Sequence, residues 1–339
     1  MPSAAPESLR FGTLTILPPL FLAPMAGLTH SALRRLVVGL GGVGLLATEM
    51  LSAARLPSES PAISPYLVRT PVESPLCYQV LLGKVEEVAP AFAALHRLGA
   101  DAIDLNLGCP APNVRRIGGG SSLRERPEFT RQLVAEARRA TSLPLSAKIR
   151  LGATIDGGEL REFCRMLEGE GIELLTVHAR LSGEKFCRKP RWERIAQVKE
   201  WVKVPIVANG GIASAEDARQ CLAMSGADGL MIGRAAAQQP WLFAEIAREV
   251  YGLEVAPPNL SRPAVYFRFL ANLTENFAPE RRLGRLKEFT HYFAKNYPFG
   301  LRLAAAVQSS DSMSQASARA RAFFAKNDPA YCSESCSKI

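Results

Sequence analysis

Residues 104–114 read DLNLGCPAPNV, a stretch that places a cysteine between Gly108 and Pro110 at the end of an apolar segment. Glycine and proline both interrupt regular strand and helix, so Cys109 is predicted to lie on a fixed turn. A free cysteine is most often a small buried hydrophobic residue. On an exposed turn it suits proton donation instead, because a thiol with its ordinary pKa of about 8.5 is mostly protonated near neutrality. The residues that accompany Cys109 decide between packing and chemistry.

Other candidate residues lie near the ends of further apolar segments. They are Pro24 and Met25, Gln79, Asn106, Lys148 and Arg150, His178 and Arg180, Asn209 with Gly210 and Gly211, and Gly233 with Arg234. Each has an ordinary structural explanation when taken alone; His178, for example, suits a buried, hydrogen-bonded imidazole. Their repeated placement after apolar segments favours one shared site.

Two of these segments have the residue types of a phosphate site. ANGGI (208–212) supplies a glycine pair whose backbone N–H groups can approach an anion, and MIGRAA (231–236) supplies a glycine followed by a guanidinium. A guanidinium binds phosphate through two parallel hydrogen bonds, and a following helix N-terminus favours the same charge. We therefore expect a phosphorylated cofactor here.

The elements that must position these residues alternate between strand and helix. Eight apolar runs fall at 19–27, 43–50, 75–83, 100–110, 144–152, 172–180, 205–211 and 227–235, mostly separated by amphipathic stretches. This alternation predicts parallel strands joined by helices, and eight units in a row favour a (β/α)8 TIM barrel over a doubly wound sheet. In such a barrel the active site lies at the C-terminal ends of the strands, where the candidate residues fall.

After residue 250 the alternation stops. A proline-rich hinge (254–263) leads into helical periodicity, so we predict a barrel over 1–250, a small helical C-terminal domain over 260–328 and a polar tail over 329–339. The net charge of the chain is +9, and from Tyr251 onward there are 12 Lys and Arg against 7 Asp and Glu. Excess positive charge is compatible with a polyanionic partner.

Composition narrows the class of protein. The chain has 339 residues, 47% of them hydrophobic, and no apolar run reaches the roughly 20 residues that a membrane-spanning helix needs. The N-terminus lacks the layout of a secretory signal. Seven scattered cysteines do not form a disulfide framework, and the Cys332–Cys336 pair lacks partners for a metal site. These observations favour a cytoplasmic protein without a bound metal.

The order of the motifs resembles the tRNA-dihydrouridine synthases, flavoproteins that reduce uridine in tRNA. The matching stretches are LAPMAGLTHSALRRL, DLNLGCPAPNVRRIGGGSSL, AKIRLG, LLTVHAR, PIVANGGI and GADGLMIGRAAAQQPWLF, which together span residues 22–243. After LLTVHAR the chain departs from the family pattern, with Leu181 and Phe186 where a threonine and a tyrosine are usual.

This resemblance implies FMN at the barrel mouth and NADPH as its reductant. Cys109 would be the catalytic acid that protonates C5 of the uracil after hydride has reached C6, and the substrate-binding residues would include Asn106, Arg150 and Arg180. The cofactor-binding residues would be Pro24, Met25, Gln79, Lys148, His178, Asn209, Gly211, Gly233 and Arg234. The partner would be tRNA, held by the helical domain through phosphate contacts from Arg281, Arg282, Arg285 and Lys287.

Two other interpretations remain open from the sequence. A flavin barrel of the dihydroorotate dehydrogenase type acts on the same bond of a free pyrimidine, but would leave the basic helical region unexplained. A non-catalytic RNA-binding flavoprotein would not need the full set of polar residues at the strand ends. The sequence does not indicate which uridine is reduced.

Overall fold

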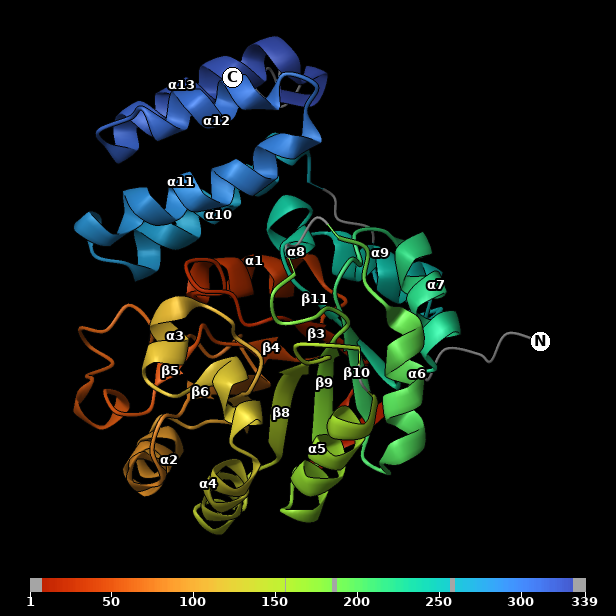
Figure 1. Cartoon of the computed structure of the whole chain (residues 1–339). Coiled ribbons are helices and arrows are strands. Elements are labelled where there is room, and N and C mark those ends of the chain that lie inside the picture. The colour runs from red at the N-terminus through yellow and green to blue at the C-terminus, as the bar shows by residue number, and fades with distance from the viewer. Residues whose placement is uncertain (1–7, 156, 185–187, 257–259, 332–339) are drawn as a thin grey trace.

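The computed structural model describes residues 8–155, 157–184, 188–256 and 260–331. Within these ranges eight parallel strands form a nearly closed barrel, in the order β3-β11-β10-β9-β8-β7-β6-β4 (Figure 1). The strands are β3 (Leu20–Leu22), β4 (Leu46–Ala47), β6 (Leu76–Leu81), β7 (Ala102–Asn106), β8 (Leu145–Arg150), β9 (Leu174–His178), β10 (Ile206–Asn209) and β11 (Gly229–Ile232). The predicted (β/α)8 barrel is confirmed.

The barrel closes between β3 and β4 through a single bridge that pairs Phe21 with Leu45. The backbone N–H of Leu22 donates to the carbonyl of Leu45 across this seam at 2.9 Å. A further short strand, β5 (Leu51–Ser52), pairs with the second half of β6, whereas β4 pairs with the first half. The long proline-rich connection after β5 contains little regular structure, because its prolines cannot supply the N–H groups that a ladder or helix needs.

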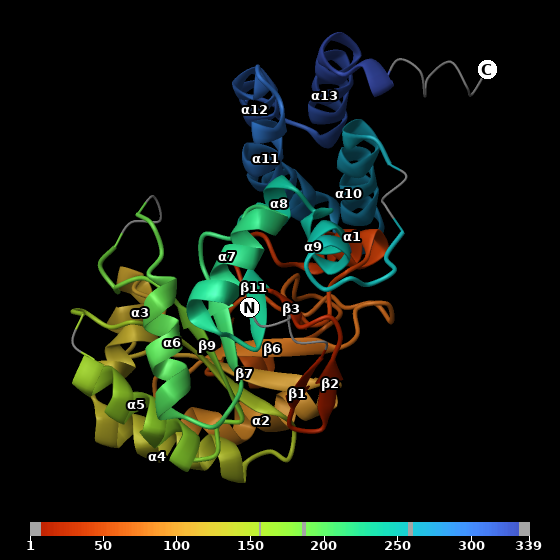
Figure 2. The ribbon, with the colours of Figure 1, turned by 90° about the vertical axis from the view of Figure 1, so that its right-hand side faces the viewer.

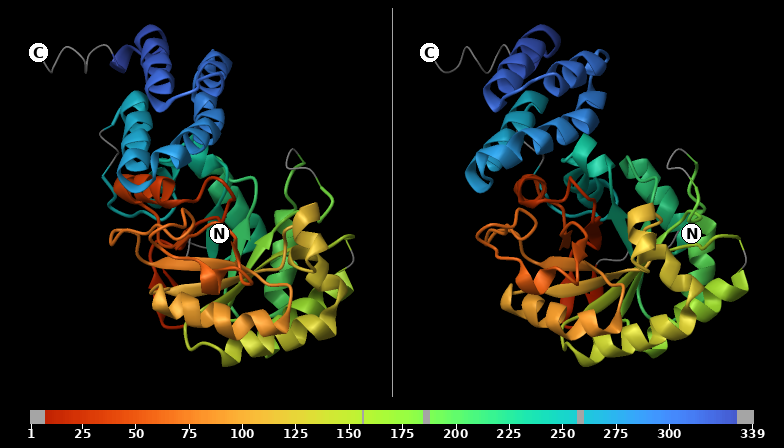
Figure 3. Two further views of the ribbon diagram at one scale, coloured as in Figure 1. Left: turned by 90° about the vertical axis from the view of Figure 1, so that its left-hand side faces the viewer. Right: turned by 60° about the vertical axis from the view of Figure 1, so that its left-hand side comes forward.

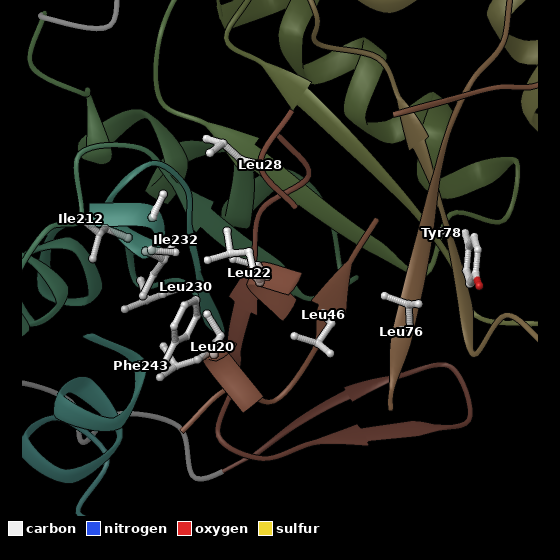
Figure 4. Close-up of a cluster of buried hydrophobic side chains, with 14 of the residues drawn as sticks. Leu20, Leu22, Leu28, Leu46, Leu76, Tyr78, Ile212, Leu230, Ile232 and Phe243 are labelled. Carbon is white, nitrogen blue, oxygen red and sulfur yellow. The ribbon is translucent and has the colours of Figure 1, made fainter. Parts of the chain in front are cut away.

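Apolar side chains fill both faces of the barrel wall, as expected for parallel strands buried on both sides. Figure 4 shows the outer face, where Leu20 of β3 and Leu230 of β11 lie against Phe243. Alternate residues point inward, and Phe21, Leu174 and Met231 belong to a separate cluster inside the barrel. The strand period of two residues therefore builds two cores from one sheet.

The inner core is completed by a hairpin that the sequence analysis did not predict. It consists of β1 (Leu9–Phe11) and β2 (Leu14–Ile16), which pair antiparallel. Phe11 and Ile16 are fully buried and belong to the inner cluster, so the hairpin covers the N-terminal end of the barrel (Figure 2).

Helices cover the outside of the barrel. They are α1 (Ser31–Leu40), α2 (Val88–Arg97), α3 (Pro112–Arg116), α4 (Pro127–Arg139), α5 (Gly157–Gly169), α6 (Trp192–Trp201), α7 (Ala215–Ser225), α8 (Ala235–Gln238) and α9 (Leu242–Glu249). The Ser214 hydroxyl caps the start of α7, where it accepts from the N–H of Asp217.

Between residues 260 and 331 the structure has four α-helices: α10 (Arg262–Asn276), α11 (Arg282–Phe293), α12 (Gly300–Gln308) and α13 (Met313–Asn327). They stand over the α1 side of the barrel (Figures 1 and 3). The side-chain amide of Asn272 on α10 donates to the Ala32 carbonyl on α1 at 3.1 Å. On the other side Asn296, just after α11, donates to the Gln238 carbonyl on α8 at 2.6 Å. These contacts join the C-terminal helices to the barrel near the strand ends.

Several features singled out in the sequence lie outside the described residues, namely Phe186, Cys332, Cys336 and most of the polar tail. Cys77, Cys109, Cys164 and Cys221 are free thiols. In the described part of the chain, no helix is both long and apolar enough to cross a bilayer. The same residues contain no group of His, Cys, Asp or Glu arranged to hold a metal ion.

Candidate active site

A cavity of about 590 Å³ lies at the C-terminal ends of the barrel strands. It is lined by all of the residues that the sequence analysis assigned to the site: Pro24, Met25, Gln79, Asn106, Cys109, Lys148, Arg150, His178, Arg180, Asn209, Gly211, Gly233 and Arg234. These residues come from strands far apart in the sequence, and the barrel brings them together. Their individual roles stay predictions.

Cys109 lies on a tight turn after β7. The side-chain oxygen of Asn106 accepts hydrogen bonds from the N–H of Gly108 (3.3 Å) and of Cys109 (3.0 Å). The Cys109 carbonyl accepts from the N–H of Ser121 at 2.9 Å. At Gly120 the backbone has φ +61°, and a Cβ there would lie 2.4 Å from that carbonyl oxygen. The turn is thus held from both sides, and its close approach requires glycine.

Lys148 spans the mouth of the barrel. Its Nζ donates a 2.8 Å hydrogen bond to Oδ1 of Asn209, whose Nδ2 donates in turn to the Met231 carbonyl at 2.8 Å. The pKa of Lys148 is lowered to about 8, chiefly by burial; the carboxylate of Asp104 opposes this shift and the charge of Arg150 adds to it. The charges of Lys148 and Arg150 also interact with Cys109. A thiolate at Cys109 would therefore lie in a positive environment.

His178 is buried and neutral. The Nη1 of Arg180 lies 3.0 Å from Nε2 of His178, and a guanidinium can only donate, so Nε2 accepts. Burial and the neighbouring cations lower the pKa of His178 far below its ordinary value. Arg180 itself is held by the Arg188 carbonyl, which accepts from Nε (2.9 Å) and Nη2 (2.7 Å). Arg150 donates to the Leu181 carbonyl at 2.9 Å.

The far end of the cavity combines glycines with cations. Gly210 and Gly211 have φ of +108° and +79°, and a Cβ at Gly210 would lie 2.7 Å from the His178 ring. Arg234 follows β11, directly before α8, and α8 is only four residues long. From the C-terminal helices, Tyr292 and Lys295 reach the same cavity, with Nζ of Lys295 lying 5.3 Å from the centroid of the Tyr292 ring.

The charged residues that line the cavity are all positive. Its cations are Lys148, Arg150, Arg180, Arg234 and Lys295, and none of the described residues that line it is Asp or Glu. Apolar side chains such as Met25, Leu28 and Met50 line the side near β3 and β4. A site of this kind suits a flat, partly apolar molecule that carries an anionic group.

The family model described as dihydrouridine synthase matches residues 21–322, which include both the barrel and the C-terminal helices. The chain belongs to the dihydrouridine synthase family. As a dihydrouridine synthase it is an oxidoreductase that works with a flavin. The predicted family is therefore confirmed.

Named relatives match over most of this dihydrouridine synthase. The tRNA-dihydrouridine(16) synthase of Pseudomonas putida is 33% identical over 305 residues, which cover 87% of this chain and 94% of that protein. A probable tRNA-dihydrouridine synthase of Rhodobacter capsulatus is 32% identical over 265 residues, which cover 78% of this chain and 81% of that protein. The tRNA-dihydrouridine synthase B of Pseudomonas syringae is 35% identical over 240 residues, 71% of each chain.

Solved structures show the same fold at low identity. A variant of NCR from Zymomonas mobilis has a TM-score of 0.54 and 14% identity, covering 73% of this chain and 92% of that one. Histamine dehydrogenase from Rhizobium sp. 4-9 has a TM-score of 0.58 and 13% identity, covering 81% of this chain and 51% of that one. At this identity the likeness concerns the barrel fold of the dihydrouridine synthase alone.

Met50, Tyr292 and Lys295 line the cavity without having been predicted from the sequence. Met50 follows β4, so the strand-end rule that identified its neighbours could have found it. Tyr292 and Lys295 lie in the stretch HYFAKNY, which carries no signal of a site. Only the packing of α11 against the barrel reveals them.

Proposed function

We propose that this dihydrouridine synthase reduces the C5=C6 bond of uridines in tRNA, with FMN as its flavin, NADPH as its reductant and Cys109 as its catalytic acid. One observation carries the proposal: the turn that holds the Cys109 thiol lines a cavity rich in cations, to which the C-terminal region contributes Tyr292 and Lys295. The family and its tRNA-modifying relatives support the substrate class.

The residues present fit a flavin with a single phosphate. The volume is in the range of small-molecule sites, and Pro24 and Met25 offer an apolar wall for a ring system. Lys148 would meet the polar edge of the ring, and Gly211 with Arg234 would hold the phosphate. When bound and reduced, the flavin supplies the hydride that C6 of the uracil receives.

The protein supplies the proton and the orientation. Cys109 would transfer the proton of its thiol to C5, leaving a thiolate that Lys148 and Arg150 stabilise until solvent reprotonates it. The amide of Asn106 holds the backbone of the same turn and can orient the uracil. Because Nε2 of neutral His178 accepts from Arg180, the ring proton is on Nδ1, which can only donate and adds no charge to the cavity wall.

The C-terminal helices would hold the rest of the tRNA. The target base must leave its stack to enter the cavity, at a cost of a few kcal/mol that phosphate contacts elsewhere offset. Arg281 is exposed and Lys287 partly exposed. Arg285 is turned inward, with its Cζ 4.8 Å from the centroid of the Phe277 ring. Arg282 donates to the Phe277 carbonyl at 2.6 Å through Nε. The phosphate contacts are therefore assigned to Arg281 and Lys287.

The deciding experiment is anaerobic. The purified protein is reduced with NADPH, and flavin reoxidation is followed by stopped-flow after adding tRNA that lacks dihydrouridine. We expect rapid reoxidation by tRNA and a rate at least about 10²-fold lower for Cys109→Ala, since general acids contribute about 10²–10⁴-fold. Cys221→Ala removes a buried thiol on α7 and serves as the matched control.

Sequencing of the product tRNA then identifies the reduced position. Reoxidation by orotate or another free pyrimidine, and not by tRNA, would overturn the proposed substrate. A fully active Cys109→Ala variant would overturn the assignment of the acid, and failure of NADPH alone to reduce the flavin would overturn the reductant.

A further inference from the structure

A chain of side-chain hydrogen bonds runs from inside the barrel to the Cys109 turn. Nε2 of Gln79 donates to Oδ2 of Asp104 at 2.7 Å, and Nδ2 of Asn106 donates to Oε1 of Gln79 at 2.8 Å. Oδ1 of Asn106 then accepts from the N–H of Cys109 at 3.0 Å. The three side chains are almost completely buried, so water does not compete for these bonds.

Both ends of this chain impose the same direction on it. At the turn, the Cys109 N–H can only donate, which requires the oxygen of Asn106 to face it and its nitrogen to face Gln79. At the other end, an ionised carboxylate can only accept, which requires the nitrogen of Gln79 to face Asp104. The two amides in between can each be turned by 180°, so their orientation depends on these two ends.

Asp104 has a second partner that keeps it in place. The Ser146 hydroxyl donates to its Oδ1 at 2.7 Å, and the charge of Lys148 lies close enough to interact with the carboxylate. Asp104 is 5% exposed and precedes Asn106 by two residues on β7. Because side chains alternate along a strand, both lie on its inward face. It therefore lies beneath the cavity and does not line it.

We propose that Asp104 is a positioning residue, whose carboxylate fixes the orientation of the Gln79 and Asn106 amides and thereby the place of the turn that carries the Cys109 thiol. Each amide nitrogen has two hydrogens, and the chain uses one of them. Gln79 and Asn106 both line the cavity, and the side chain of Asn106 is 7% exposed there, so its second N–H can be offered to a bound molecule. A donor at this point suits a carbonyl oxygen of a flavin or of a uracil. This inference rests on the proposed function.

The test is a double-mutant cycle on near-isosteric variants. In Asp104→Asn, the N–H of the new amide can donate to the Ser146 hydroxyl while its oxygen still accepts from Gln79, so the chain of hydrogen bonds persists. In Ser146→Ala the carboxylate still accepts from Gln79. In the double variant the amide at position 104 has lost the hydroxyl that orients it. The orientation of the Gln79 and Asn106 amides is then no longer fixed. We therefore expect strongly non-additive effects.

The expected results are a kcat within about fivefold of wild type for each single variant and a loss on the order of 10²-fold in the double variant, as small displacements of a reacting group produce. KM for tRNA should change much less than kcat, because Asp104 does not line the cavity and the contacts of the C-terminal helices with tRNA are kept. Two further readouts do not depend on turnover: the visible spectrum of the bound flavin should shift, and alkylation of Cys109 by iodoacetamide, quantified by mass spectrometry, should change in rate.

Additive effects, or a double variant with altered thermal stability but unchanged kcat, spectrum and alkylation, would show a purely structural role and overturn the proposal. If the double variant does not fold, Asp104→Leu removes both acceptor atoms and should reproduce the same losses. If wild type fails to reduce tRNA, the proposed function is wrong, whereas the spectrum and the alkylation rate still test Asp104.

Discussion

Nζ of Lys148 donates a 2.8 Å hydrogen bond to Oδ1 of Asn209, across the strand that separates β8 from β10. Strand β9 lies between the two residues in the sheet, and both side chains reach over it into the cavity. The amine is thereby held at the level where the proposed flavin would lie. Burial lowers its pKa to about 8, so its charge is lost just above physiological pH.

Flavin affinity should depend on the protonation of Lys148. An anionic ligand favours the charged amine, so binding takes up a proton above pH 8. The dissociation constant for FMN should be flat below about pH 8 and rise by up to tenfold per pH unit above it. Lys148→Met should bind more weakly with a flat profile. Titration by quenching of flavin fluorescence between pH 6 and 9 measures both, and Lys203→Met, at an exposed site, is the control. A wild-type profile in Lys148→Met would contradict this assignment.

Gly120→Ala should impair catalysis without removing the flavin. The new Cβ would lie 2.4 Å from the Cys109 carbonyl oxygen, at a φ of +61° that a side chain disfavours. We expect kcat to fall on the order of 10²-fold as the turn shifts, and FMN affinity to stay within about threefold. Gly39→Ala is the matched control, because nothing lies within 4 Å of that added Cβ on α1; it should be neutral or stabilise by up to about 1 kcal/mol. Equal kcat in both variants would refute the close-packing argument.

Acid should destabilise the protein through its buried histidines. His30 lies between the rings of Phe269 and Phe277, and among the described residues neither of its ring nitrogens has a hydrogen-bond partner. Burial, Arg285 and Arg34 lower its pKa well below 6.5, so the unfolded chain binds a proton there before the folded one does. The contribution of His30 to the free energy of unfolding is therefore greatest above pH 6.5. It decreases as the pH is lowered from there, by up to about 1.4 kcal/mol per pH unit.

His30→Leu should remove that dependence and raise stability at pH 7 by about 1 kcal/mol, since an unpaired buried imidazole is lost. Urea unfolding at pH 7 and pH 5 measures the difference between the two proteins. Asp104 and Glu49, whose pKa values burial raises, oppose the trend equally in both and cancel in the comparison. Parallel pH profiles for wild type and His30→Leu would count against a neutral His30.

tRNA binding should depend on salt through Arg281 and Lys287. Replacing both by glutamine should weaken binding of different tRNAs alike and reduce the slope of log affinity against log salt by about 1.5, since each lost phosphate contact removes about 0.7–0.9. Fluorescence anisotropy from 50 to 300 mM salt measures the slope. Arg131 and Arg139 belong to α4, which lies on the side of the barrel away from the C-terminal helices (Figure 1), and they supply the control double variant. An equal effect in both double variants would indicate a general charge effect.

The sequence by itself determined the barrel and most of its site. Continuous apolar runs separated by amphipathic stretches define parallel strands with helices between them, and the geometry of that fold sends every strand end to one mouth. The sequence therefore predicts that Cys109, Lys148 and His178 share one site. The local pattern of strands and helices along the sequence was enough to predict the barrel, because this fold repeats one strand–helix unit.

Only the tertiary structure decided the features that do not follow from the repeated strand–helix unit. The hairpin that contains Phe11 and Ile16 consists of strands too short for periodicity to predict, and it is stable only because the barrel end buries it. Tyr292 and Lys295 join the cavity because α11 packs near α8, a contact between segments with no pattern in common. Asp104 is hidden in an apolar run, and its partners come from β6 and β8. Long-range packing, which no local pattern records, brings these groups together.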